Sequence, residues 1–178
     1  MAYRIELVFN EKGSNRIKSY WEMLKENKLN SYMIDSKSTP HISLAEYSDI
    51  LAGRFEDEIR RFSRLIKPFE VRFFGFGYFP TEERVLYLNP KVSKYLLRVH
   101  NDFNQQFVDF NDNINPYYLP ENWVPHSTLG KNFSEEDLKK SLIELSKDFK
   151  PFAVEVNRIS VVEFYPSREL FTFKLSKF

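Results

Sequence analysis

The chain has 178 residues, of which 17% are aromatic, and its formal net charge is +1. This length is enough for one sizeable core or for two small lobes that share one, and the aromatic content excludes a disordered chain. The near-neutral charge argues against a long electrostatic track for nucleic acid, which is usually strongly basic, whereas a nucleotide or a short RNA end needs only a few local cations.

The sequence contains no cysteine, which excludes a disulfide framework and a thiolate metal site. The first residues lack the apolar core of a signal peptide, and no apolar run approaches the length that spans a membrane. We therefore expect a cytoplasmic protein that has no membrane partner and acts as a monomer.

The first part of the chain predicts a strand followed by a helix. The strand is indicated by apolar residues that alternate with Arg4 and Glu6, namely Tyr3, Ile5, Leu7 and Phe9. We expect Gly13 and Ser14 to end this strand, and Ser14 to cap a helix that continues to about Lys28. The helix is indicated by apolar residues at helical spacing, namely Ile17, Tyr20, Trp21 and Leu24.

A polar loop at residues 36–39 then leads through Pro40 into a strand that begins with His41. A second helix ends at Pro68 and is indicated by one apolar face, formed by Leu51, Phe55, Ile59, Phe62 and Ile66. Four arginines lie off this face, and we favour a solvated helix surface over a phosphate-attracting patch for Arg54, Arg60, Arg61 and Arg64.

Residues 69–79 predict a long strand, in which Gly75 and Gly77 indicate a bulge or a bend. After a turn at residues 80–83, residues 84–88 predict its partner strand. A third helix follows Pro90, and His100 on this helix has no motif around it, so we interpret it as structural. The helix is indicated by Val92, Tyr95, Leu96, Val99, Phe103 and Phe107.

Residues 111–123 form a loop that leads straight into a second histidine segment. Its aromatic residues Tyr117, Tyr118 and Trp123 are candidates for the rim of a binding cleft or for stacking on a base. In a chain this rich in phenylalanine we favour ordinary packing for each of them. A helix that begins near Ser134 and strands at residues 152–164 and 171–175 complete the chain.

The two halves of the chain repeat each other. Residues 67–71 and 150–154 have similar sequences, and each segment follows a histidine strand and an amphipathic helix and precedes two more strands. A two-fold arrangement of these halves brings the two histidine strands together. The repeat does not settle whether residues 3–28 complete the second lobe or its counterpart.

Each histidine strand pairs an imidazole with a hydroxyl. Side chains two residues apart point to the same face of a strand, so His41 lies beside Ser43, and His126 lies beside Thr128. An imidazole exchanges a proton near neutral pH, and a hydroxyl donates hydrogen bonds to phosphate oxygens.

These two segments resemble the motifs of the 2H phosphoesterase superfamily, which includes 2′-5′ RNA ligase-like proteins and cyclic phosphodiesterases. The family pattern is histidine, apolar, serine or threonine, apolar, and it occurs twice. The first segment fits fully, whereas the second departs at Ser127, on the face away from the site. The resemblance implies an α+β fold in which residues 1–178 form a single domain. It has two pseudo-symmetric lobes of antiparallel sheet, helices outside and a central cleft, with motif strands near 40–47 and 124–131.

The resemblance also implies a substrate, a 2′,3′-cyclic phosphate on a nucleotide or RNA end. One neutral histidine takes a proton from water, the other gives a proton to the leaving oxygen, and Ser43, Thr128 and Lys131 bind the phosphate. Which of His41 and His126 is the acid stays open. No metal and no other cofactor is expected, because clustered metal ligands and nucleotide-binding glycine motifs are absent. The alternative is a noncatalytic module that binds an RNA end or a nucleotide.

Overall fold

The computed structural model describes residues 2–50 and 52–176, and its centre is one antiparallel sheet of seven strands. Six strands follow one another in the order β2-β1-β6-β3-β4-β5, and β7 pairs with β6 beside this path. The strands are β1 (Ala2–Phe9), β2 (His41–Tyr47), β3 (Phe69–Phe79), β4 (Val85–Pro90), β5 (Ser127–Gly130), β6 (Phe152–Phe164) and β7 (Arg168–Lys174).

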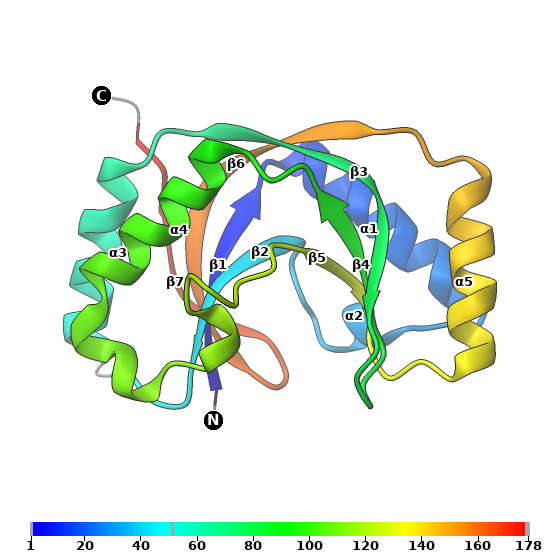
Figure 1. Cartoon of the computed structure of the whole chain (residues 1–178), viewed down its shortest axis with the longest axis horizontal. Coiled ribbons are helices and arrows are strands. Elements are labelled where there is room, and N and C mark those ends of the chain that lie inside the picture. The colour runs from blue at the N-terminus through cyan, green and yellow to red at the C-terminus, as the bar shows by residue number, and fades with distance from the viewer. Residues whose placement is uncertain (1, 51, 177–178) are drawn as a thin grey trace.

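The helices cover the two ends of this sheet in pairs. In Figure 1, α3 and α4 lie at one end of the molecule, and α1 and α5 lie at the other. None of the helices within residues 2–50 and 52–176 is both long and apolar enough to cross a membrane. The helical segments are α1 (Glu11–Glu26), α2 (Tyr32–Asp35), α3 (Ala52–Leu65), α4 (Lys94–Gln106) and α5 (Glu135–Lys147), with 3-10 turns at η1 (Val108–Asn113) and η2 (Pro116–Tyr118).

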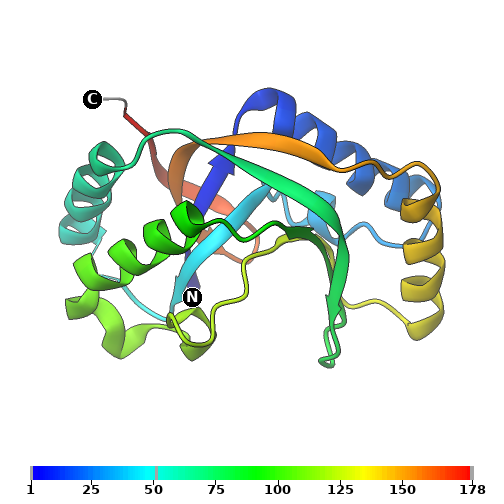
Figure 2. The ribbon, with the colours of Figure 1, turned by 45° about the horizontal axis from the view of Figure 1, so that its top comes forward.

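Strand β6 joins the two lobes, because its 13 residues take part in both. Its first residues pair with β3, whereas its later residues pair with β1 on one edge and with β7 on the other. Figure 2 shows β6 running from the end that carries α5 across the molecule to β1. The two lobes therefore share β6 as one continuous strand.

The internal repeat appears directly in the pairing of β3 with β6. Val71 and Val154 occupy equivalent places in the repeated segments, and these two residues are register partners. On either side of them, Phe69 pairs with Val156 and Phe73 pairs with Phe152. This pattern is that of a pseudo-two-fold axis at the centre of the β3–β6 pair.

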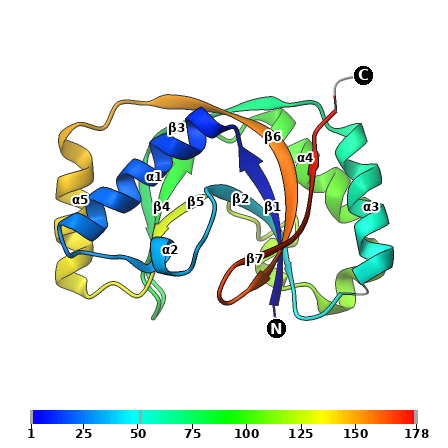
Figure 3. The same ribbon diagram turned by 180° about the vertical axis from the view of Figure 1, so that it is seen from behind.

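The same axis settles the place of the first strand and helix. Because β1 lies between β2 and β6, and β4 lies between β5 and β3, β1 is the counterpart of β4. The repeating unit is therefore β1-α1-β2-α3-β3, followed by β4-α4-β5-α5-β6, and β7 is an addition. Strands β2 and β5 end up next to each other where the lobes meet (Figures 1 and 3).

Most predicted elements are present with small changes at their ends, and the start of α1 is a correction. Ser14 does not cap this helix. The side chain of Asn10 accepts the backbone N–H of Gly13 and caps it earlier. Glycine is required inside the first turn, since a Cβ on Gly13 would lie 2.7 Å from the Cβ of Val154. Leu51, predicted as part of the apolar face of α3, lies outside the described residues.

Candidate active site

The register of β1 and β2 places a set of polar side chains on one face of the sheet. Glu6 is paired with Ser43, and Arg4 is paired with Glu46. Register partners on neighbouring antiparallel strands project to the same side. The polar residues of β1 therefore share a face with the imidazole and the hydroxyl of the first histidine strand, and the face does not open to bulk solvent at His41.

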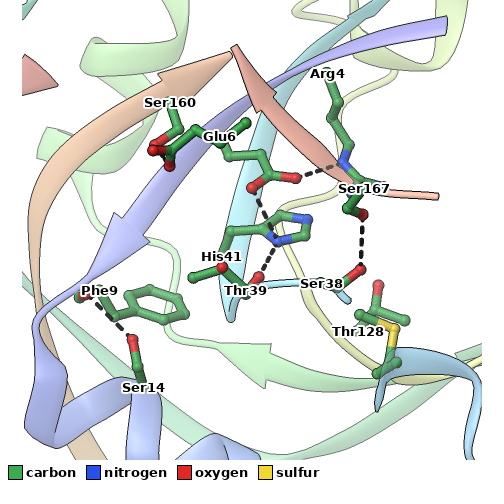
Figure 4. Close-up of polar contacts among 12 residues, drawn as sticks. Arg4, Glu6, Phe9, Ser14, Ser38, Thr39, His41, Thr128, Ser160 and Ser167 are labelled. Carbon is green, nitrogen blue, oxygen red and sulfur yellow. Dashed lines mark hydrogen bonds and ion pairs between the residues drawn. The ribbon is translucent and has the colours of Figure 1, made fainter. Parts of the chain in front are cut away.

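His41 is 5% exposed and is held by two acceptors at the same ring nitrogen. Its Nδ1 lies 2.5 Å from the carbonyl oxygen of Thr39 and 3.5 Å from Oε2 of Glu6. The other carboxylate oxygen of Glu6 accepts a hydrogen bond of 2.7 Å from Nε of Arg4. Figure 4 shows this continuous chain from Arg4 through Glu6 to His41.

His126 lies one residue before β5 and has a similar backbone contact. Its Nδ1 lies 2.7 Å from the carbonyl oxygen of Val124, two residues earlier. Its ring packs against Phe79 and Tyr87, with centroid distances of 5.0 and 5.2 Å. Because a carbonyl only accepts, Nδ1 carries the proton in both neutral histidines, which leaves Nε2 as the nitrogen that exchanges one.

The two histidines influence each other electrostatically, as groups on adjoining strands do. Burial, together with the nearby charges of His41, Lys131 and Arg4, lowers the pKa of His126 to about 4. Burial also lowers the pKa of His41, but here the carboxylate of Glu6 acts in the opposite direction. The structure thus brings His41 and His126 together in unlike surroundings.

The predicted phosphate ligands lie on the same two strands. Ser43 is buried on β2. Thr128 is half-buried, and its backbone carbonyl accepts a hydrogen bond of 3.1 Å from the indole of Trp21. Lys131 lies at the end of β5 with its Nζ 3.0 Å from the carboxylate of Glu83. Its charge acts on His126, so Lys131 belongs to the same electrostatic environment.

The three aromatic residues of the preceding loop have different surroundings. Tyr117 is 77% exposed on η2, whereas burial and Glu46 raise the pKa of its neighbour Tyr118 to about 12. Trp123 is buried, and its ring stacks on His100 at a centroid distance of 3.8 Å. Trp123 is therefore a packing residue, which is the interpretation that we favour from the sequence. Its indole donates a hydrogen bond of 3.0 Å to the backbone of Ser43.

The sequence interpretation missed two residues of this site, Arg4 and Glu6. Their alternation with apolar residues is typical of a strand with one solvated face, yet both side chains are buried. What identifies Arg4 and Glu6 is the pairing of β1 with β2. This pairing places the polar side chains of β1 beside His41, so they become part of the site. Within residues 2–50 and 52–176, no group of three or more histidine, aspartate or glutamate side chains is placed to hold a metal ion.

Comparison with known proteins agrees with this architecture. The crystal structure of TT0787 from Thermus thermophilus is 17% identical, with a TM-score of 0.67 and 98% of each chain covered. The crystal structure of E. coli LigT in apo form is 14% identical, with a TM-score of 0.65, over 99% of this chain and 98% of LigT. LigT in complex with 3′-AMP gives a TM-score of 0.64 at 13% identity over the same shares.

These structures establish the fold, and a family model establishes the relationship. No curated protein matches the chain significantly. The model described as 2′-5′ RNA ligase superfamily matches residues 11–167, which include both histidine segments. The protein therefore belongs to the 2′-5′ RNA ligase superfamily and, at that level of description, is a phosphoesterase of the two-histidine kind.

Proposed function

We propose that the protein is a metal-independent phosphoesterase that hydrolyses the 2′,3′-cyclic phosphate of a nucleotide or RNA end. The observation that carries this proposal is the shared arrangement of His41 and His126. Each Nδ1 is held by the carbonyl oxygen of the residue two places earlier, so each Nε2 is left to exchange a proton. Two such nitrogens on adjoining strands match the needs of concerted proton transfer.

In the proposed reaction, the neutral histidine removes a proton from water while the water oxygen forms a bond to phosphorus. The bond from phosphorus to one sugar oxygen breaks, and the protonated histidine gives its proton to that oxygen. Negative charge gathers on the remaining phosphoryl oxygens as this happens. The hydroxyls of Ser43 and Thr128 donate hydrogen bonds to those oxygens, and Lys131 supplies positive charge nearby.

The substrate is identified by a screen of 2′,3′-cyclic nucleotides, 2′-5′ oligonucleotides and RNA with a cyclic end, with products assigned by mass. We expect a monoester from at least one cyclic substrate, at the same rate with and without EDTA. Binding without turnover would instead favour the noncatalytic module. Activity that EDTA removes and a divalent ion restores would replace this proposal with metal-assisted hydrolysis.

Replacing Ser43 or Thr128 with alanine is expected to lower kcat/KM by about 10–10²-fold. Each change removes one hydrogen bond to a charged group, which contributes roughly 1.5–3 kcal/mol, and about 1.4 kcal/mol corresponds to tenfold. The effect is expected in kcat as well as in binding, because the bond strengthens as charge develops. Steady-state kinetics on the cyclic substrate measure both.

Ser127 provides the matched control for these two variants. It lies between His126 and Thr128 in the sequence, it is buried, and its Oγ has no hydrogen-bond partner among the described residues. Ser127→Ala therefore removes a hydroxyl from the same strand without touching phosphate, and kcat/KM should stay near the wild-type value. An equal loss in all three variants would show that packing of β5, rather than phosphate binding, is being measured.

A further inference from the structure

The strands that carry the two motifs share an irregularity at equivalent positions. The pairing of β1 with β2 shifts register just before Glu6, which leaves Leu44 unopposed. The pairing of β4 with β5 shifts just before Tyr87, which leaves Leu129 unopposed. The two leucines are 129 − 44 = 85 residues apart, the same spacing as the two histidines. The pseudo-two-fold axis therefore relates Glu6 to Tyr87.

This equivalence shows that one position has opposite chemistry in the two lobes. Glu6 lies opposite Ser43, and Tyr87 lies opposite Thr128. The motif residues themselves are alike in both lobes, and so are the backbone contacts of the imidazoles. The side chain next to each imidazole differs, since it is a carboxylate in the first lobe and an aromatic ring in the second.

The carboxylate beside His41 is buried between two basic groups. Glu6 is 2% exposed, and its two oxygens face two basic groups, Nε of Arg4 at 2.7 Å and Nδ1 of His41 at 3.5 Å. The Arg4 guanidinium lies over the ring of Phe164, and its Nη2 has no hydrogen-bond partner among the described residues. Buried charged groups in proteins are typically paired in this way.

His126 has no such partner. Its Nδ1 contacts a neutral carbonyl, its ring packs on Phe79 and Tyr87, and the charged groups that act on it are His41, Lys131 and Arg4. No carboxylate within the described residues lies at ion-pair distance from its ring. A proton on His126 therefore gains no carboxylate partner, whereas a proton on His41 faces the carboxylate of Glu6.

We propose that Glu6 is a positioning residue that stabilises the imidazolium of His41, so that His41 is the proton donor of the reaction and His126 is the base. Arg4 supports this role by holding the carboxylate in place. The inference rests on the proposed function and adds to it which histidine is the acid and which is the base. It follows from the equivalence of Glu6 and Tyr87, a position where the two lobes differ in charge next to the imidazoles.

The opposite assignment demands the less stable pattern of charges. A protonated His126 and a neutral His41 would leave Glu6 facing a neutral ring and would place the proton on the ring that has no carboxylate partner, near Lys131 and Arg4. The pKa of His126, lowered to about 4, agrees with this view. The productive enzyme molecules are those with a protonated donor and a neutral base. If the donor has the lower pKa of the two histidines, this fraction falls about tenfold for each pKa unit between them.

The test measures the histidines individually by NMR, since the chain has only three. Imidazole signals are assigned with His41→Asn, His100→Asn and His126→Asn and are then titrated in the wild type without substrate. We expect His41 to titrate at a higher pH than His126. The reverse order of the two pKa values overturns the assignment. The titration of the wild type requires no active substrate and no substitution of a buried charged residue.

Glu6→Gln then isolates the carboxylate, because the amide keeps the shape and can still accept the bond from Arg4. An opposite charge at this range shifts a pKa by about 1–3 units, so the pKa of His41 should fall by that amount while that of His126 stays in place. The alkaline limb of kcat/KM should move down with it. A uniform loss of activity with both limbs unmoved would show a merely structural role.

Glu46→Gln is the matched control, because Glu46 is a carboxylate of β2 that bonds Asn115 and does not contact either imidazole. It should leave the titration of His41 unchanged, and an equal shift in both variants would overturn the specific role of Glu6. The experiment also separates the two proposals. Absence of turnover on every cyclic substrate would disprove the proposed function. The order of the histidine titrations would still show whether His41 or His126 holds a proton more tightly.

Discussion

Replacing His41 or His126 with alanine is expected to lower kcat/KM by about 10²–10⁴-fold, because each change removes one proton transfer. The double replacement should cost far less than the product of the two single losses, since residues that act as a unit are not additive. Once one proton transfer is lost, the remaining imidazole can accelerate the reaction only slightly. Kinetics on the cyclic substrate identified in the screen measure all three variants.

Asparagine at the same positions separates chemistry from structure. Its side-chain N–H₂ group can take over the contact of Nδ1 with the carbonyl of Thr39 or Val124, but it offers no counterpart of Nε2. We expect His41→Asn and His126→Asn to fold, as judged by circular dichroism, and to be as inactive as the alanine variants. A folded variant that keeps near wild-type activity would disprove the two-histidine mechanism.

The wild-type rate should be highest on the acid side of neutrality, which is the second large effect. The pKa of His126 is lowered to about 4 and that of His41 lies below its ordinary 6.5, so the neutral and protonated forms coexist between these values. Above the upper limb, kcat/KM should fall about tenfold per pH unit as the donor is lost. Profiles of kcat/KM between about pH 3.5 and 8.5 test this expectation.

The profile of kcat should lie at higher pH than that of kcat/KM, because bound phosphate is negative and favours protonated imidazoles. Coincident profiles would contradict direct contact between phosphate and this pair. A limb above about pH 8 in kcat/KM would contradict the lowered pKa of both rings. The acid limb of the kcat/KM profile needs a folding control, because protonation of the buried His100 also destabilises the fold at low pH.

Burial lowers the pKa of His100 to about 4, and His126 is similar, whereas an unfolded histidine titrates near 6.5. Between these values the unfolded chain binds more protons, so the free energy of unfolding decreases as pH falls from about 6.5 to about 4. Circular dichroism at each pH shows whether lost activity reflects protonation of the base or loss of the fold.

Much of this arrangement can be predicted from local sequence. The strand at residues 69–79 begins and ends where its alternation and Pro68 and Pro80 predict. Both histidine segments were identified because proline, histidine, hydroxyl and leucine recur at a fixed spacing. Ser134 caps α5 as its neighbour Asp137 suggests. These features depend on residues close together in the chain.

The errors arise where distant residues decide. Gly13 looked like a break, but it permits α1 to pack on Val154, which lies 141 residues later (154 − 13). Packing is favoured for Trp123, but its partner, the ring of His100 on α4, is not specified by the local sequence. Arg4 and Glu6 were not identified as site residues, because nothing in the sequence specifies which strand lies beside β1.

The pairing of Val71 with Val154 has a consequence for how the active site can be assembled. A homodimer of one repeat, joined about the same axis, would form a comparable sheet, but its two imidazoles would have identical neighbours. It could offer two carboxylates or two aromatic rings at the positions of Glu6 and Tyr87, and never one of each. Joining both repeats in one polypeptide frees these positions to differ, so covalent continuity is what permits a permanent donor and a permanent acceptor.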